Sequence, residues 1–313
     1  MNNLIYKAYN LFFESDSFNN QMYGHNVIMR NYARVRLPYI IPGQLQHGWH
    51  IDHGIHGDLR DISEKVKLKK YFIWNGNNLT NAHKYGFNNV IAIGAPFIYL
   101  PEIKFDFETK SNSVLLFPIH SCESEGFVDP INTFQRYLAD INFLHNEFES
   151  ITACLYWREY ENESIRKLFE NNGINVITLG HRDNNPNFLF AFCKHAYEHE
   201  FISSNIFSTA IFYGLYLKRK TFILGSAKSE EWNFKQWEGR KLYDSGVFED
   251  QYHEILWEHF DQKSHSWIGN KELGLEFKKS PEDICKLFNW NPITYFKRNV
   301  PYTGRKIAKF LRK

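Results

Sequence analysis

Polar side chains follow four short apolar runs in the middle of the chain, and they include hydroxyl, imidazole and guanidinium groups that can bind anions. The four polar segments begin after Phe117, Leu155, Leu179 and Ile202. In an open parallel sheet, ligands bind beyond the carboxyl ends of the strands. The pattern therefore predicts one anion-binding crevice, with the candidate residues Arg158, Gly180, His181, Ser203, Ser204, Asn205, Ser208 and Thr209.

The segment Ser203 to Thr209 is the most informative of the four. Ser208 and Thr209 precede a helix-like run at residues 210–217. Unpaired N–H groups and the positive end of a helix dipole favour a phosphate at this position. Alternatively, Ser208 simply caps the helix. With His181 and Arg158 expected at the same sheet edge, phosphate binding is the favoured interpretation.

A second cluster lies at residues 46–56, where four histidines occur at every third position. A metal site is one interpretation of this spacing. However, Gly48, Gly54 and Gly57 oppose the regular helix that would align the imidazoles, and Asp52 is the only acidic residue among them. We therefore predict no metal site here. Imidazole titrates near neutral pH, so the segment is also a candidate for acid–base chemistry.

Four stretches within residues 90–225 resemble the GT-B glycosyltransferases and related proteins of bacterial capsule and lipopolysaccharide synthesis. These stretches are residues 117–123, 154–158, 178–189 and 204–217. In relatives that use CMP-activated sialic acid or Kdo, a histidine loop and a serine-rich loop bind the nucleotide. His181 with Ser203, Ser204, Ser208 and Thr209 could match those loops, which favours a CMP-linked ulosonic acid donor.

The histidine cluster also resembles the His-Gly segment of cytoplasmic polymer-forming transferases, in which a histidine is the general base. His47 is the matching residue. A retaining transfer would instead need a carboxylate nucleophile, for which Asp52, Glu123 and Glu125 are candidates. The predicted catalytic residues are His47, Asp52, His120 and Glu123.

The resemblance implies a transferase that moves a sugar from a nucleotide-sugar donor to a bacterial surface glycan or a glycolipid acceptor. No Asp-x-Asp motif occurs in the sequence, which favours a metal-independent enzyme with no cofactor besides the donor substrate. The alternatives are a sugar epimerase or polyol-phosphate transferase of the same fold, and a non-catalytic sugar-binding subunit of an assembly complex.

The elements that must position these residues are short strands alternating with helices, which predicts an α/β fold with parallel sheets. Strand-like runs occur at residues 34–41, 71–74, 90–93, 114–117, 151–155, 176–179, 201–203 and 221–224. Gly173 stands where a helix over residues 161–171 needs a left-handed cap. We expect a GT-B-like pair of Rossmann-like domains facing a cleft: an acceptor-side domain at 1–112, a donor-binding domain at 113–290 and a basic tail at 291–313.

Length and charge limit the partners. With 313 residues and 43% hydrophobic residues the chain can fill two domains. Seven basic and no acidic residues follow Asn291, and apolar residues separate them. This tail predicts either attachment to an anionic membrane surface or a solvated basic terminus, and no nucleic-acid groove. The apolar runs are too short for a membrane span or signal peptide, so we expect a cytoplasmic protein, attached at most peripherally, with four reduced cysteines.

Overall fold

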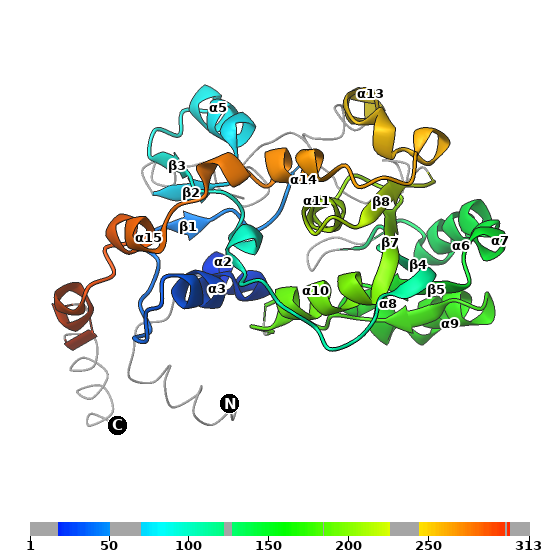
Figure 1. Ribbon diagram of the computed structural model, residues 1–313, viewed down its shortest axis with the longest axis horizontal. Helices are drawn as coiled ribbons and strands as arrows, with labels where there is room; N and C mark the ends of the chain where they lie inside the picture. The colour runs from blue at the N-terminus through cyan, green and yellow to red at the C-terminus, as the bar shows by residue number, and fades with distance from the viewer. Residues whose placement is uncertain are drawn as a thin grey trace.

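The computed structural model describes residues 18–50, 70–121, 127–183, 185–225, 244–297 and 299–300. The predicted catalytic residues Asp52 and Glu123 lie outside these ranges, as do Glu125 and residues 301–313. Two parallel sheets stand side by side, with helices around them (Figure 1). The α/β class and the parallel strand pairing are thereby confirmed.

The smaller sheet has three parallel strands in the order β1-β2-β3. Its strands are β1 (Gln44–Leu45), β2 (Tyr71–Ile73) and β3 (Val90–Ala92). All three residues of β2 are buried, as expected for a central strand that is covered on both faces. Helices before and after these strands cover the sheet: α2 (Phe18–Gln21), α3 (His25–Tyr32), α5 (Gly76–Lys84) and the 3₁₀ turns η1 (Met22–Gly24) and η3 (Pro96–Tyr99).

The larger sheet has five parallel strands in the order β6-β5-β4-β7-β8. Its strands are β4 (Lys110–Leu116), β5 (Ser150–Cys154), β6 (Asn175–Ile177), β7 (His199–Ser204) and β8 (Lys220–Ile223). The chain moves outward from β4 to β6 and then crosses back to β7, which is the strand order of a Rossmann-like sheet. This order places a crevice between the ends of β4 and β7. The connecting helices are α6 (Pro130–Ile141), α7 (Leu144–Glu147), α8 (Trp157–Glu161), α9 (Glu163–Asn171), α10 (Phe188–Glu198) and α11 (Thr209–Tyr216).

Local signals explain most of these boundaries. Asn162 accepts hydrogen bonds from the first backbone amides of α9, and Gly173 follows the helix with a φ of 72°. The predicted left-handed cap at Gly173 is therefore confirmed. The strand predicted at residues 34–41 is wrong, because this segment is a loop without strand partners. Arg34 has a φ of 55° there, and Pro38 removes a backbone donor that a sheet ladder needs.

After β8 the chain returns to the smaller sheet. It passes through α13 (Val247–Gln251), the 3₁₀ turns η5 (His253–Ile255) and η6 (Trp257–His259), α14 (Ser266–Glu272), η7 (Leu275–Phe277) and α15 (Pro281–Leu287). Phe288 packs edge-on against Phe72 of β2 at 4.8 Å between ring centroids. The Trp290 indole N–H donates to the Ile40 carbonyl at 2.8 Å. The first and last described helices therefore lie near the smaller sheet (Figure 1), and their buried residues belong to one core that continues into the larger sheet.

Within the described ranges, the helices are all too short or too polar to cross a bilayer.

Candidate functional site

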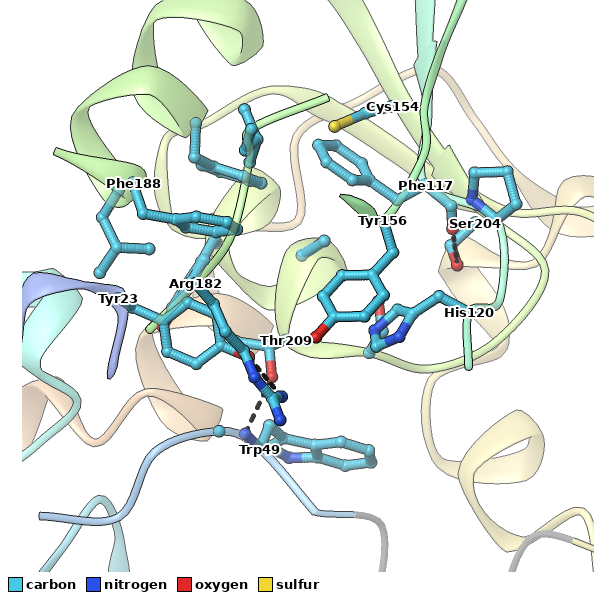
Figure 2. Close-up of a pocket in the computed structure, with 18 of the residues that line it drawn as sticks. Tyr23, Trp49, Phe117, His120, Cys154, Tyr156, Arg182, Phe188, Ser204 and Thr209 are labelled. Carbon is cyan, nitrogen blue, oxygen red and sulfur yellow. Dashed lines mark hydrogen bonds between the residues drawn. The ribbon is translucent and has the colours of Figure 1, made fainter. Parts of the chain in front are cut away.

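A cavity of about 320 Å³ lies where the strand ends of the larger sheet meet the end of β1 (Figure 2), within the usual size range of small-molecule sites. It sits at the point where the strand order reverses, the position at which Rossmann-like sheets bind ligands. Four strand-end segments supply one wall: Phe117, Pro118 and His120; Leu155 and Tyr156; Thr178 to Gly180 and Arg182; and Ser204 with Ile206 to Thr209. The opposite wall is the segment His47 to His50.

Arg182 projects its guanidinium into this cavity, beside Tyr23, Thr209 and Trp49 (Figure 2). Its guanidinium carbon lies 5.9 Å from the ring centroids of both Tyr23 and Tyr156. Its Nη1 donates to the Tyr23 hydroxyl at 3.3 Å, and its backbone carbonyl accepts the Tyr23 amide at 2.9 Å. The two rings hold the cation in place before any ligand arrives, which is the arrangement that binds an anion at low entropic cost.

The start of helix α11 forms another part of the same wall. Ser208 is the N-cap residue, but its side chain makes no capping hydrogen bond. Its hydroxyl is a buried group without a hydrogen-bond partner in the described structure. Thr209 accepts the Trp49 backbone amide at 2.9 Å, which joins the histidine segment to the helix. The positive end of α11 and the Ser208 hydroxyl therefore face the cavity together.

The histidine segment is held rigidly by its neighbours. The Gln46 side chain donates to the Gly48 carbonyl at 2.8 Å, and the Trp49 indole donates to the buried Glu272 at 2.7 Å. His47 and His50 consequently line the cavity with their rings 5.3 Å apart.

Burial lowers the pKa of His47 and of His25, which keeps these two imidazoles neutral near pH 7. It lowers the pKa of His47 well below the usual value, and nearby His50, Arg182 and His25 act in the same direction. Burial alone lowers the pKa of His25 to about 3. The described residues that line the cavity include no aspartate or glutamate. An anionic ligand would therefore meet one guanidinium, three histidines (His47, His50 and His120) and a helix N-terminus. Asp183 lies outside the cavity lining, with a carboxylate oxygen 3.6 Å from Arg182 Nε.

His120 is oriented by a hydrogen bond to the Ser121 backbone and by ring stacking on Tyr156. Its Nδ1 lies 2.5 Å from the Ser121 carbonyl oxygen, which can only accept, so Nδ1 carries the proton. The neutral ring therefore has its basic lone pair on Nε2. The Ser121 hydroxyl donates at 2.5 Å to Glu159, which is 4% exposed, and the His120 ring stacks on Tyr156 at 4.6 Å. A side chain held in one tautomer in this way can act as a general base.

Six of the residues predicted from the sequence line this cavity. They are His47, His120, Gly180, Ser204, Ser208 and Thr209. Ser204 also has a structural task, because its hydroxyl donates to the Phe117 carbonyl at 2.6 Å. This bond links the ends of β7 and β4.

The other four predicted binding residues lie outside the cavity lining. Arg158 is exposed on α8, and His181 packs against Trp157 with ring centroids 4.6 Å apart. Asn205 accepts the Ile119 amide at 2.8 Å and so supports the loop after β4. The Ser203 hydroxyl is buried within β7 and has no hydrogen-bond partner in the described structure.

Sequence reasoning overlooked Tyr23, Tyr156 and Arg182. Arg182 stands next to His181 in the loop that was singled out, so its charge was a usable signal. Tyr23 lies more than 150 positions before Arg182, in a 3₁₀ turn with a φ of 55°, and no local pattern marks it as a partner of that loop.

In the part of the chain that the structure describes, no three His, Cys, Asp or Glu side chains come together as metal ligands. No protein-family model matches the chain, and no curated protein is significantly similar to it.

Proposed function

We propose that the chain is a glycosyltransferase of the GT-B type that uses a nucleotide-activated sugar. The observation that carries the proposal is the cavity at the switch point of the larger sheet, with Arg182 and the α11 N-terminus on one wall and His47 and His50 on the other. Such a site suits the phosphate of a sugar nucleotide. Two parallel sheets on either side of the cavity support a two-domain arrangement. The sequence resemblance favours a CMP-linked ulosonic acid as the donor.

In the proposed reaction, an acceptor hydroxyl attacks the anomeric carbon of the donor sugar. The new C–O bond forms as the bond between that carbon and the phosphate oxygen breaks, and the phosphate leaves with the electron pair. His120 Nε2 takes the acceptor proton. Arg182, Ser208 and the first amides of α11 stabilise the negative charge on the leaving phosphate. The acceptor is a surface glycan or a lipid-linked oligosaccharide.

The apolar part of the cavity suits the flat faces of the nucleotide base. Phe117, Phe188 and Phe192 line it. Cys154 also lines it and lies beside Phe117 (Figure 2). Aromatic walls of this kind stack on ring systems and exclude water from the reacting phosphate.

A thermal-shift panel with CMP, CDP, UDP and GDP tests the donor site. A nucleotide at about 100 times its Kd adds about 2.7 kcal/mol to the free energy of unfolding, which is readily seen. Transfer from the corresponding sugar nucleotides to glycan acceptors is then followed by NMR, which also separates transfer from epimerisation. If no nucleotide stabilises the protein, the proposal is wrong.

The catalytic role needs its own variant. His120→Gln should keep nucleotide affinity within about two-fold and lower the transfer rate by about 10²-fold or more, because general-base catalysis contributes about that much. Nucleotide binding without turnover by the unmodified protein, across all donors and acceptors, would favour the non-catalytic sugar-binding subunit instead.

A further inference from the structure

Three large apolar side chains lie exposed within eight residues near the end of the described chain. Ile293 is 68% exposed, Phe296 is 59% exposed and Val300 is 65% exposed. Residues 292–297 are helical, and so are 299 and 300. A spacing of three and then four residues places these three side chains on one side of such a helix. We call Ile293, Phe296 and Val300 the C-terminal face.

The other side of this helix is fixed to the protein. Tyr295 is buried and packs edge-on against Tyr39 at 5.3 Å between ring centroids. The Asn299 side chain is also buried and donates to the Tyr295 carbonyl at 3.0 Å. Asn291 caps the helix by accepting the Thr294 amide at 2.9 Å. The helix is therefore anchored by one side, and the C-terminal face points away from the core.

Exposed cations lie on this helix and in the segment that reaches its contact residue Tyr39. Lys297 is exposed on the same helix, and Arg34 and Arg36 are exposed in the segment that leads to Tyr39. Leu37, between them, is also exposed. From Asn291 to the end, the sequence has seven basic residues and no acidic one. Figure 1 places this helix beyond α15, at the end of the molecule away from the larger sheet.

We propose that the C-terminal face is a docking surface for an anionic lipid bilayer. Apolar side chains of this kind enter the boundary between headgroups and acyl chains, while the surrounding lysines and arginines contact anionic headgroups. A second copy of the chain fits this surface poorly, because both copies carry a basic C-terminal sequence with no acidic residue after Asn291, and like charges repel. The inference does not depend on the proposed enzymatic activity.

Vesicle sedimentation with the full chain tests this surface. At low salt, the protein should bind vesicles of phosphatidylglycerol and phosphatidylcholine. It should not bind vesicles of phosphatidylcholine alone. Binding should weaken as salt is raised, since screening over about 8 Å at physiological ionic strength weakens exposed charge pairs. Ile293→Ser combined with Phe296→Ser should weaken vesicle binding at least about ten-fold, because the variant lacks the two apolar side chains that would move from water into the bilayer interface.

Val128→Ser is the matched control, since Val128 is also 68% exposed but precedes α6 at the larger sheet. It should bind vesicles like the unmodified protein. All variants should keep the unmodified melting temperature, because the altered side chains are exposed. Failure of the unmodified protein to bind anionic vesicles, or equal binding by the double variant, overturns the proposal. If the unmodified protein forms a concentration-dependent dimer and does not bind vesicles, and only the double variant fails to dimerise, the C-terminal face is a self-association surface instead.

Discussion

Arg182 is the single side chain on which the proposed donor site depends most. Arg182→Gln should weaken nucleotide binding about ten- to one-hundred-fold, because a hydrogen bond to a charged group contributes about 1.5–3 kcal/mol. Isothermal titration with the most strongly stabilising nucleotide measures the loss. The matched control is Arg158→Gln, since Arg158 is exposed and outside the cavity lining. Equal losses in both variants would contradict the site as described.

Ser204 and Ser208 both line the cavity but differ in what their hydroxyls do. Ser204 donates to the Phe117 carbonyl, whereas the Ser208 hydroxyl is buried without a partner in the described structure. Ser204→Ala should lower the free energy of unfolding by about 1–3 kcal/mol, because it removes a hydrogen bond to the part-buried Phe117 carbonyl and one from the Ile206 amide. Ser208→Ala should leave stability unchanged and weaken nucleotide binding. Urea unfolding and titration calorimetry separate the two effects, and a reversed pattern would be inconsistent with this geometry.

The buried histidines make stability depend on pH. The pKa of His25 falls to about 3 in the folded protein, against the usual value of 6.5. Below pH 6.5 the unfolded chain therefore binds a proton that the folded chain does not, so stability falls as pH decreases. The loss is about 1.4 kcal/mol per pH unit for each such histidine.

Urea unfolding at about pH 7.5 and about pH 5.5 brackets the ordinary histidine pKa and measures this slope. His25→Asn should reduce the change in the free energy of unfolding per pH unit by the contribution of one buried histidine. The control His253→Asn should retain the full slope, because the His253 side chain is 61% exposed. An unchanged slope in His25→Asn would mean that His25 is solvated or paired in solution.

The turn before α3 carries the cavity residue Tyr23 and depends on Gly24. Gly24 has a φ of 73°, and a Cβ there would overlap the Pro186 carbonyl oxygen in the loop after β6. Gly246 has a similar φ of 70°, and no atom of the described residues would lie within 4 Å of a Cβ there. Gly24→Ala should therefore cost several kcal/mol more than Gly246→Ala, which adds only backbone strain of about 1 kcal/mol. Thermal unfolding of both variants measures the difference in stability. Equal losses of stability would show that the turn at Gly24 can move away from the loop that contains Pro186.

The elements of the larger sheet were predictable from the sequence, and those of the smaller sheet were less so. Apolar runs such as Val114 to Phe117 alternate with helices, and that period is a local property. In contrast, β1 has only two residues and takes its register from hydrogen bonds to β2. The loop at residues 34–41 is apolar because Tyr39 packs against Trp290, not because it is a strand. Local periodicity cannot distinguish these two causes.

The candidate site was also predictable only in part from the sequence. The sheet rule identified the correct strand ends, so Gly180, Ser208 and Thr209 were expected where they lie. It could not say which of two neighbouring side chains, His181 or Arg182, turns toward the cavity. That choice depends on Tyr23, which contacts Arg182 across 159 positions of sequence.

At the scale of the whole molecule, the smaller sheet depends on the C-terminal helices. Phe288 packs on Phe72 of β2, the Trp290 indole donates to the Ile40 carbonyl before β1, and both belong with Ile284 to one buried cluster. Each contributes about 1.5–3 kcal/mol by burial, so together they approach the 5–15 kcal/mol that stabilises a typical domain. A chain that ends after Ser280 should therefore lose amide protection in Tyr71–Ile73 while Ser150–Cys154 stays protected. Hydrogen exchange measures both, and a chain ending after Val300 is the control. Equal protection in the two truncated chains would contradict this dependence.

The contact between Phe72 and Phe288 also delays completion of the smaller sheet during protein synthesis. Phe72 leaves the ribosome 216 residues before its partner. At about 5–20 residues per second, the wait is roughly ten to forty seconds. The larger sheet has all five strands by residue 223 and can fold during this interval. The smaller sheet meanwhile leaves its aromatic side chains exposed to solvent, which makes the nascent chain a natural client for chaperones that bind apolar segments until the last helix is made.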